Sequence, residues 1–275
     1  MKTSYLILMI LTAAAAACLL YGFFLEPRWI RVRKFRLARG PHLEGLSILF
    51  FSDLHLGRST SEGKLDRLIR KIMKYQPDAL IFGGDLVEEK TPLYDPAFRA
   101  RILEALDSLQ APLGKWAIYG NHDVEAPRFR KWVTEILQDS GFQILENSQS
   151  QIGGLPVWGF ANTHHGLPAL DKGAFNKAEG EESFRLFLVH ECDWYPAAMP
   201  WKGPGLVLSG HSHYGQVTLL GLPLIRPAGA KKYWRGSYKL GEKLGMIVSA
   251  GVGTVHIHAR FFARPDLILL NFEAE

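Results

Sequence analysis

Five short segments of the chain place possible metal ligands directly after an apolar run. The segments are Asp53-Leu54-His55, Gly84-Asp85, Gly120-Asn121-His122-Asp123, His190 and Gly210-His211-Ser212-His213. Apolar runs of this kind are typical of strands that are buried on both faces, and polar side chains just past their ends are poorly placed for packing. Carboxylate, amide and imidazole groups in such positions are well placed to bind a metal ion.

Seven side chains form the expected ligand set. They are Asp53, His55, Asp85, Asn121, His190, His211 and His213. A single histidine in an apolar setting is more often a hydrogen-bonded core residue than a ligand. Seven such residues at strand ends, however, would leave a large buried polar cluster if no cation satisfied it. Because the set mixes oxygen and imidazole without thiolate, it indicates divalent Mn, Fe or Zn rather than a structural zinc site.

Apolar runs and amphipathic segments alternate in the first half of the chain. Strands are expected over residues 29–37 (an edge strand), 46–52, 79–82 and 116–119, and helices over 61–75, 98–109 and 129–137. Thr60 or Ser61 is the expected cap of the first of these helices. This order implies parallel strands with helices on the sheet faces, and ligands in such sheets bind beyond the carboxyl ends of the strands.

The second half of the chain is richer in strands. They are expected over residues 155–160, 185–189, 206–209, 216–220 and 266–272, with a hairpin over 237–250 that turns at 241–243. No internal repeat or low-complexity tract interrupts the chain. We therefore expect one α/β domain over residues 28–275, built as a two-sheet sandwich with helices outside.

The N-terminal segment contains no charged residue from Tyr5 to Leu25. A membrane-spanning helix needs about 20 apolar residues, whereas the apolar region of a cleaved signal peptide is typically about 7–15 residues. Cys18 could mimic a lipid-attachment site, but the apolar run continues past it. The length therefore favours an uncleaved transmembrane anchor over residues 1–27.

The charges that flank this segment predict its orientation. Lys2 precedes it, and six basic residues follow, namely Arg28, Arg31, Arg33, Lys34, Arg36 and Arg39. By the positive-inside rule, the chain is expected to be a single-pass protein of the inner (cytoplasmic) membrane with its catalytic domain in the cytoplasm. The net charge of +5 suits phosphates or anionic lipid without establishing either. Two cysteines exclude a disulfide framework.

The five segments, in this order, resemble the signature of the calcineurin-like metallophosphoesterases, D-x-H, G-D, G-N-H-D, H and G-H-x-H. The resemblance covers nearly all of the chain after the apolar segment, and the apolar N-terminus resembles the membrane-anchored bacterial branch of that family. It implies a four-layer α-β-β-α sandwich. It also implies a hydrolase in which a hydroxide that bridges two metal ions attacks a phosphodiester or pyrophosphate bond.

The resemblance also implies roles for single residues. Asp53, His55 and His213 would hold one divalent ion, Asn121, His190 and His211 the second, and Asp85 would bridge the two. His122 would protonate the leaving oxygen or stabilise the transition state. Asp123 would orient His122 or fix the turn, with a helix N-cap as the alternative.

The substrate is expected to be a phosphorylated lipid or another phosphodiester. Basic and aromatic residues mingle over residues 231–235 and 260–264, which suits a membrane surface, although a solvated face is the plainer interpretation. Tyr214, Lys232 and Arg235 are the expected substrate contacts. His164 and His165 could also touch substrate, but an exposed loop is the favoured interpretation.

Several activities remain open for such a site. By resemblance the first candidate is UDP-2,3-diacylglucosamine, cleaved at its pyrophosphate in lipid A synthesis. A phosphomonoesterase, a phosphoprotein phosphatase or a nuclease of the same fold are alternatives, although no nucleic-acid partner is expected. A non-catalytic membrane-tethered scaffold would lack some of the ligands, and here none is missing. No obligate protein partner is evident.

Overall fold

The computed structural model describes residues 2–38, 43–57, 62–169, 183–198, 201 and 203–273. Its α-helices are α1 (Lys2–Leu20), α2 (Glu62–Met73), α3 (Pro96–Asp107), α4 (Pro127–Asp139) and α6 (Trp194–Ala198). Its strands are β1 (Arg31–Ala38), β2 (Ser47–Phe51), β3 (Ala79–Phe82), β4 (Gly114–Ala117), β5 (Phe142–Ile144), β6 (Ser148–Ile152), β7 (Leu155–Gly159), β8 (Arg185–Leu188), β9 (Gly205–Ser209), β10 (Thr218–Leu219), β11 (Leu222–Pro223), β12 (Gly236–Lys239), β13 (Leu244–Val248) and β14 (Asp266–Glu273).

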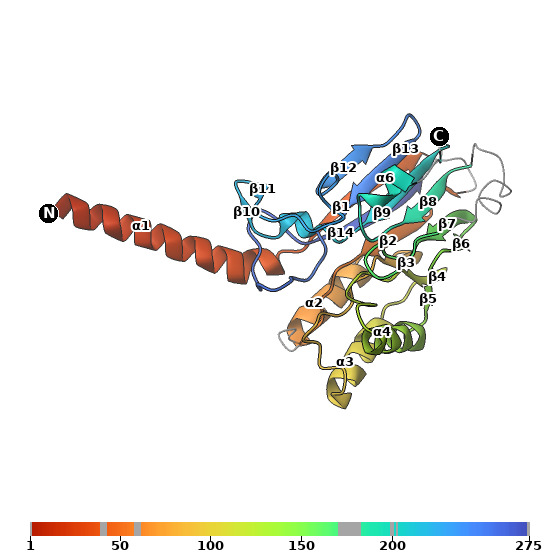
Figure 1. Cartoon of the computed structure of the whole chain (residues 1–275), viewed down its shortest axis with the longest axis horizontal. Helices are drawn as coiled ribbons and strands as arrows, with labels where there is room; N and C mark the ends of the chain where they lie inside the picture. The colour runs from red at the N-terminus through yellow and green to blue at the C-terminus, as the bar shows by residue number, and fades with distance from the viewer. Residues whose placement is uncertain are drawn as a thin grey trace.

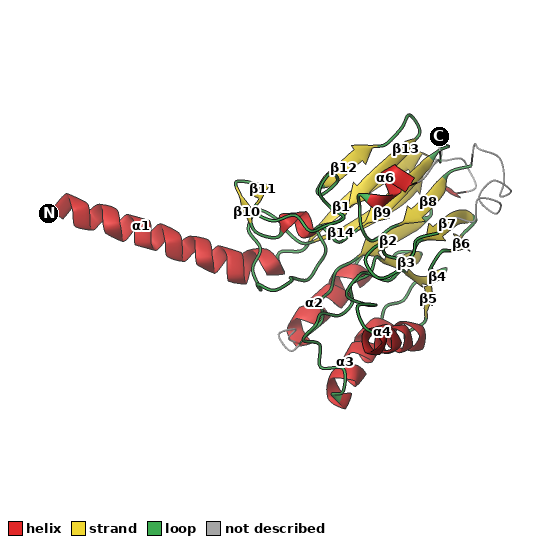
Figure 2. Cartoon of the chain, viewed as in Figure 1, coloured by secondary structure: helices red, strands yellow, loops and turns green. Residues whose placement is uncertain are grey.

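Two mixed six-stranded sheets form the body of the molecule (Figure 2). The first has the order β1-β14-β2-β3-β4-β5, and β2 to β5 run parallel, as the alternation of strands and helices predicts. The second has the order β12-β13-β9-β8-β7-β6, with β13, β9, β8 and β7 parallel. The predicted hairpin is confirmed as the antiparallel pair β12 and β13, and β1 is confirmed as an edge strand.

Three apolar layers hold these sheets in place. Ile81 and Ile118 of the first sheet pack against Leu186 and Leu208 of the second, which forms the core between the sheets. Helices α2, α3 and α4 cover the outer face of the first sheet (Figure 1). Aliphatic side chains at helical spacing explain this packing, because they form one apolar face along each helix.

The expected fourth layer differs from the prediction. Among the described residues, the outer face of the second sheet is covered by the five-residue α6 and by aromatic side chains from loops, including Trp201 and Tyr233. The strand expected over residues 216–220 shrinks to the two residues of β10, because a 3-10 turn at His213–Gly215 precedes it. The predicted cap at Thr60 or Ser61 lies outside the described residues.

The N-terminal helix extends away from the body (Figure 1). Over Thr3–Arg28 it is long and apolar enough to cross a membrane, although a signal sequence would pass the same test. Its end is attached to the body at residues 260–263. The carbonyl of Gly22 accepts the N–H of Arg260 at 2.9 Å, and the buried carboxylate of Glu26 accepts the N–H of Phe262 at 2.8 Å.

Candidate metal centre

The carboxyl ends of the parallel strands carry all seven predicted ligands. In the first sheet, Asp53 and His55 follow β2, Asp85 follows β3 and Asn121 follows β4, while in the second sheet His190 follows β8 and both His211 and His213 follow β9. Because the core between the sheets holds both sets of strand ends at the same edge of the sandwich, residues that are 160 positions apart in the chain become neighbours.

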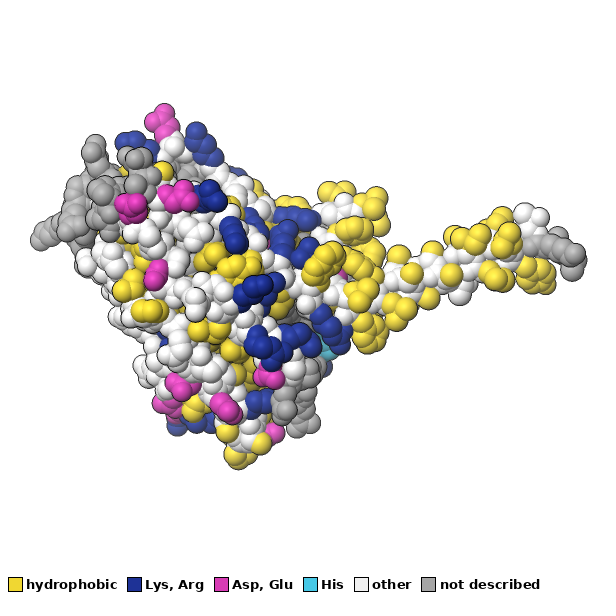
Figure 3. Space-filling view, turned by 180° about the vertical axis from the view of Figure 1, so that it is seen from behind, with side chains coloured by type: hydrophobic (Ala, Val, Ile, Leu, Met, Phe, Trp, Pro, Cys, Tyr) yellow, Lys and Arg dark blue, Asp and Glu magenta, His cyan; other side chains and the backbone are white. Residues whose placement is uncertain are grey.

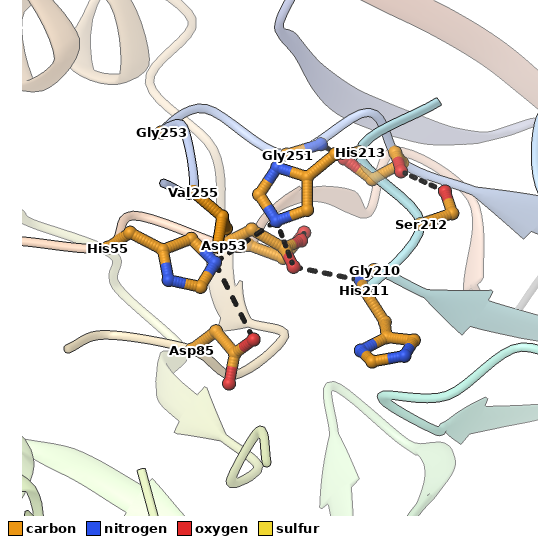
Figure 4. Close-up of polar contacts among 12 residues, drawn as sticks. Asp53, His55, Asp85, Gly210, His211, Ser212, His213, Gly251, Gly253 and Val255 are labelled. Carbon is orange, nitrogen blue, oxygen red and sulfur yellow. Dashed lines mark hydrogen bonds and ion pairs between the residues drawn. The ribbon is translucent and has the colours of Figure 1, made fainter. Parts of the chain in front are cut away.

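Asp53, His55 and His213 form the first cluster (Figure 4). Their ligand atoms lie within 4.8 Å of one another. The Nε2 atoms of His55 and His213 are 3.0 Å apart, and Nε2 of His213 is 3.5 Å from Oδ1 of Asp53. All three side chains are buried. This is the trio that the family resemblance assigns to one metal ion.

Asp85, His190 and His211 form the second cluster. One carboxylate oxygen of Asp85, Oδ2, lies 3.1 Å from Nε2 of His190 and 3.6 Å from Nε2 of His55. Asp85 therefore stands between the two clusters, which is the position expected of a bridging ligand. Asn121 follows β4 beside them, and its Oδ1 is buried without a hydrogen-bond partner among the described residues.

Hydrogen bonds from the surrounding backbone orient these ligands. Nδ1 of His190 lies 2.8 Å from the carbonyl of Gly83, and Nε2 of His211 lies 2.6 Å from the carbonyl of Ala228. Each of these nitrogens donates its proton to the carbonyl, which leaves the other ring nitrogen for a ligand. The N–H of His211 in turn donates to Oδ1 of Asp53 at 2.8 Å.

Burial sets the protonation of the histidines in the absence of metal. It lowers the pKa of His55 to about 3 and that of His211 to about 4, and it holds the pKa of His213 well below its usual range. These three imidazoles are therefore neutral at pH 7, the form that binds metals. Burial acts on Asp85 and His190 too, but their ion pair outweighs it, which lowers the pKa of Asp85 and raises that of His190.

This arrangement fits a pair of divalent cations. The Nε2 atoms of two neutral imidazoles, His55 and His213, lie 3.0 Å apart, where only one of them can carry the proton, and the buried Oδ1 of Asn121 has no hydrogen-bond partner among the described residues. Asp53 and Asp85 add two buried carboxylates. Cations would satisfy these groups, and oxygen with imidazole suits Mn, Fe or Zn.

His122 and Asp123 have different surroundings. The side chain of His122 is 24% exposed, and its Nδ1 lies 3.3 Å from Oε2 of Glu125. Its ring meets that of His55 edge-on, with the centroids 5.2 Å apart. His122 therefore faces the metal clusters from the solvent side, as expected of a group that contacts substrate.

Asp123 is buried and bonds to backbone rather than to His122. Its carboxylate accepts the N–H groups of Asp85 and Leu86 at 2.7 Å each, and that of Gly120 at 2.9 Å. It does not cap α4, whose N-cap is Ala126. Of the roles expected for Asp123, these contacts support the one in which it fixes a turn. Asp123 was grouped with the catalytic residues, and this is corrected to a positioning role.

A cavity of about 480 Å³ opens beside the clusters. Residues of the metal site form its floor, and His164 lies in its wall. His164 lies in an exposed loop, as favoured, but it also faces this cavity, and its Nδ1 is held 3.1 Å from the buried Oε1 of Glu191. The position of His164 after β7 was the available signal, because it repeats the pattern of the other sites.

The three expected substrate contacts lie outside the lining of this cavity. Tyr214 is 1% exposed, and its hydroxyl contacts Nη1 of Arg33 at 2.6 Å and the carbonyl of Val248 at 3.0 Å. Its ring lies in the apolar cluster on the outer face of the second sheet. Arg235 stacks on that ring, 5.3 Å from its centroid, and Lys232 lies over Tyr233. The predicted role of Tyr214 is thus contradicted by its burial.

The basic and aromatic stretch over residues 260–264 also contains a buried member. Arg260 is fully buried, and its Nη2 donates to the carbonyls of Ala250 at 2.8 Å and Gly253 at 2.6 Å. The same atom lies 3.4 Å from Nδ1 of His213. Arg260 therefore packs behind His213 of the first cluster. The sequence pattern predicted a charged surface for this stretch and did not predict that Arg260 is buried.

Comparison with known proteins agrees with the metal site that the geometry indicates. Residues 46–215 match the family model described as Calcineurin-like phosphoesterase. The metallophosphoesterase YkuE of Bacillus subtilis is 28% identical over 268 residues, which cover 92% of this chain and 89% of that protein. Phosphodiesterase YaeI of Escherichia coli is 28% identical over 272 residues, or 94% of each chain. UDP-2,3-diacylglucosamine pyrophosphatase LpxG of Chlamydia trachomatis is 38% identical over 117 residues, 40% of this chain and 33% of that one.

Proposed function

The chain belongs to the calcineurin-like phosphoesterase family and is a metal-dependent hydrolase, and from this premise we propose that it cleaves a phosphodiester or pyrophosphate bond in a membrane-associated lipid. The observation that carries the phosphoesterase assignment is the position of Asp85. One of its oxygens lies 3.1 Å from His190 of one cluster and 3.6 Å from His55 of the other. Two cations that share this carboxylate would be close enough to act on one phosphoryl group.

Each side chain has a place in this proposal. Asp53, His55 and His213 would hold one cation, Asn121, His190 and His211 would hold the other, and Asp85 lies where it could contact both. When bound, such ions would supply positive charge for the phosphoryl oxygens and lower the pKa of water. Because no serine or cysteine is needed as the nucleophile, no covalent phosphoenzyme is expected.

His122 supplies a proton in this proposal. Its Nδ1 is directed at Glu125, which holds the ring at the edge of the cavity and leaves Nε2 for the leaving oxygen of the substrate. A general acid in this position typically contributes about 10²- to 10⁴-fold to the rate. His164 lies across the cavity beside His211, with the ring centroids 5.5 Å apart, and its pairing with Glu191 raises its pKa. A cationic His164 would bind a phosphate oxygen.

Two observations support a lipid substrate. The cavity beside the metal site has an apolar wall that includes Val217, Leu224 and Ile257. The partial match to LpxG, whose name specifies UDP-2,3-diacylglucosamine, makes this pyrophosphate the first candidate. Its diacyl portion would contact the apolar wall while its pyrophosphate lies over the metal ligands.

The N-terminal helix supports a membrane location. As an uncleaved anchor over residues 1–27, it would hold the domain over residues 28–275 at the cytoplasmic face of the inner membrane, since basic residues follow it. We expect protease added to spheroplasts to leave the C-terminal body intact and N-terminal sequencing to find Met1 or Lys2. Digestion from outside would reverse the orientation, and a mature N-terminus beyond residue 17 would indicate a cleaved signal instead.

Hydrolysis of model esters tests the reaction class. We expect protein reconstituted with Mn, Fe or Zn to hydrolyse bis(p-nitrophenyl) phosphate faster than p-nitrophenyl phosphate. The opposite preference would favour a phosphomonoesterase or phosphoprotein phosphatase. Salt-sensitive inhibition by DNA would favour a nuclease. No turnover with any of the metals would leave a membrane-tethered scaffold.

A panel of lipids then tests the substrate. UDP-2,3-diacylglucosamine is compared with UDP-N-acetylglucosamine, which carries the same pyrophosphate without acyl chains. Phosphorus-containing products are identified by mass spectrometry. Equal turnover of the two compounds would contradict the lipid preference while preserving the phosphoesterase assignment.

A further inference from the structure

The β10–β11 hairpin presents an unusually apolar surface to solvent. Five of the seven residues from 219 to 225 are exposed aliphatic side chains, which we call the apolar rim: Leu219, Leu220, Leu222, Leu224 and Ile225. Leu220 is 83% exposed and Ile225 is 77% exposed. Soluble proteins rarely expose such a group of large apolar side chains unless it contacts another surface.

The backbone conformation at the tip of the hairpin gives a second sign that the exposed leucines have a function. Leu220 and Gly221 connect the two strands, with φ angles of 52° and 88°. A two-residue turn with both φ angles positive strongly favours asparagine or aspartate followed by glycine. Leucine in the first position is both strained and exposed, so folding alone does not account for it.

The apolar rim is continuous with the cavity of the metal site. Leu224 and Ile225 line the same cavity as Asp85 and His213. Val255 and Ile257, from a different loop, also line it. A molecule that contacts the rim would therefore meet an apolar path that leads directly to the metal ligands.

The hairpin also lies beside the base of the N-terminal helix (Figure 1). The N–H of Phe261 donates to Gln216 at 2.9 Å, and its carbonyl accepts the N–H of Thr218 at 3.0 Å. The neighbouring Arg260 and Phe262 make the hydrogen bonds to Gly22 and Glu26 described above. A short hydrogen-bonded path thus fixes the rim relative to the end of the apolar helix.

Basic side chains gather close to this apolar surface. Arg28 is exposed at the base of the helix, where it bonds to Phe24, and Arg226 is exposed directly after Ile225 together with Lys231, whose Nζ donates to the carbonyl of Arg226. Figure 3 shows Lys and Arg side chains beside the hydrophobic ones where the helix joins the body. Apolar side chains bordered by lysine and arginine are typical of surfaces that bind the interface of an anionic bilayer.

We propose that the apolar rim inserts into the interface of a bilayer that contains anionic lipid, so that the metal-site cavity opens directly onto the membrane. The acyl chains of a lipid substrate then stay in the bilayer while its phosphate reaches the metal ligands. This second part rests on the proposed phosphoesterase function, whereas the insertion of the rim does not. The continuity of the rim with the base of the apolar helix favours a bilayer over a second copy of the chain.

Depth measurements on the full-length protein test the insertion. A Cys18→Ser background removes the exposed thiol, and Cys192 is buried. Leu220→Cys in this background is labelled with a nitrobenzoxadiazole dye and reconstituted into phosphatidylglycerol-containing vesicles. The matched control is Leu113→Cys, because Leu113 is 45% exposed just before β4, at the end of that strand opposite to the metal ligands.

We expect lipids with a nitroxide on the acyl chain to quench the dye at position 220 and not at position 113. Equal quenching at both positions, or no quenching at position 220, would overturn the proposal. Excimer formation between pyrene labels at position 220, without quenching by lipid, would assign the rim to a second copy of the chain.

Activity measurements separate this proposal from the proposed function. Leu220→Ser combined with Leu222→Ser changes two rim residues that do not line the cavity. We expect about a tenfold or greater loss of kcat/KM for lipid in vesicles, because two leucines lose their contact with the bilayer. Hydrolysis of soluble bis(p-nitrophenyl) phosphate should stay within about twofold of wild type, as it should for the control Leu113→Ser, since neither change alters the metal ligands.

Failure of the rim proposal and failure of the proposed function give different results. Full activity of the double variant on vesicles, or an equal loss on both substrates, would overturn the role of the rim. Absence of soluble-diester turnover in the wild-type protein would instead contradict the proposed function, and the quenching measurement would still decide whether the rim inserts.

Discussion

The imidazole of His190 illustrates how single residues prepare this site. One ring nitrogen donates to the carbonyl of Gly83 at 2.8 Å, and the other faces Asp85 at 3.1 Å. In the absence of metal a proton holds the Asp85–His190 pair together, which raises the pKa of His190 and lowers that of Asp85. A cation that binds Asp85 has to displace this proton, so metal affinity depends on pH.

His122→Ala tests the general acid. We expect kcat to fall by about 10²- to 10⁴-fold for a diester with a poor leaving group, because the leaving oxygen loses its proton donor. With p-nitrophenolate, which leaves without a proton, the loss should be much smaller. Steady-state kinetics on both esters measure the difference.

The control for this prediction is His165→Ala. His165 is exposed in the same cavity-side loop as His164 but does not line the cavity, so its loss should change neither rate. Metal content, measured by elemental analysis, should remain that of the wild type in both variants. Full activity of His122→Ala on the poor leaving group would exclude the assignment.

Asp123→Asn tests the positioning role of the buried carboxylate. The substitution keeps the shape but replaces one carboxylate oxygen by an NH₂ group, which then faces either the N–H groups of Asp85 and Gly120 or that of Leu86. We expect the free energy of unfolding to fall by about 3 kcal/mol, because hydrogen bonds to the buried carboxyl group are lost and backbone donors are left unsatisfied. Urea unfolding of the metal-free protein measures this, with the exposed Asp66→Asn on α2 as the control. An unchanged unfolding free energy would contradict the role.

Residue identities at the site were more predictable than residue roles. The seven ligands follow apolar runs, and that pattern is visible in the chain itself. The pattern does not indicate, however, whether the side chain of a neighbouring residue points toward the site or into the core. Tyr214 lies in the apolar core with its hydroxyl bonded to Arg33 and Val248, and Arg260 is buried because backbone carbonyls surround its guanidinium. Both facts depend on loops that no local periodicity describes.

At the scale of elements, backbone strain is found in the turns that follow the strands and hold the ligands. Asp53, His55, Asp85, His211 and His213 all have positive φ angles, between 44° and 64°. Non-glycine residues rarely adopt this conformation, and each instance costs on the order of 1 kcal/mol. Five instances among the ligands indicate that the turns are shaped to direct side chains inward rather than to reach the lowest backbone energy.

Gly120→Ala tests how closely the turns after β3 and β4 approach. A methyl group at this position would overlap both Oδ1 and the backbone nitrogen of Asp85. We therefore expect the turns to separate and the protein to bind at most one of two metal ions, since Asp85 and Asn121 both lie on these turns. Elemental analysis after reconstitution with Mn measures the loss.

The matched control is Gly241→Ala in the hairpin turn between β12 and β13. There the added carbon would lie 3.9 Å from Cβ of Leu244, which is an ordinary contact. Metal content and activity should equal those of the wild type. Two bound ions in Gly120→Ala would show that the turns can separate without losing the site.

Long elements were predictable, and short ones were not. The helices α2, α3 and α4 and the strands β2 and β3 lie within a few residues of their predicted positions, because their apolar periodicity extends over a full element. The strands β5 and β6 were missed. β5 has only three residues, and β6 has little apolar content, so neither shows a clear apolar pattern in the sequence. Both form strands because they pair with the neighbouring strands β4 and β7.

At the scale of the whole molecule, the two sheets contribute to the metal site from opposite sides. Asp53, Asp85 and Asn121 come from the first sheet, and His190, His211 and His213 come from the second. The contacts within each cluster, such as Asp53 with His213 and Asp85 with His190, therefore join the two sheets at one edge of the sandwich. Metal binding should thus affect the stability of the entire body rather than that of one loop.

Metal removal tests this connection. Without cations, Asp53 and Asp85 are buried close together, and burial raises the pKa of Asp53 to about 6 because its charged form is poorly solvated. Cations would stabilise both carboxylates in the folded state alone. At a metal concentration about a thousandfold above Kd the gain is about 4 kcal/mol, which corresponds to a rise in Tm of roughly 10 °C for a domain of this size.

Calorimetry of the detergent-solubilised protein with Mn, and after treatment with a chelator, measures this difference. Asp85→Asn is the informative control, because it removes the carboxylate whose Oδ2 lies between His55 of the first cluster and His190 of the second. Its Tm should hardly respond to Mn. If the wild-type protein melts at the same temperature with and without metal, the seven strand-end side chains do not join the sheets through cations. Asp53 would then be stabilised by protonation, and Asp85 by its ion pair with His190.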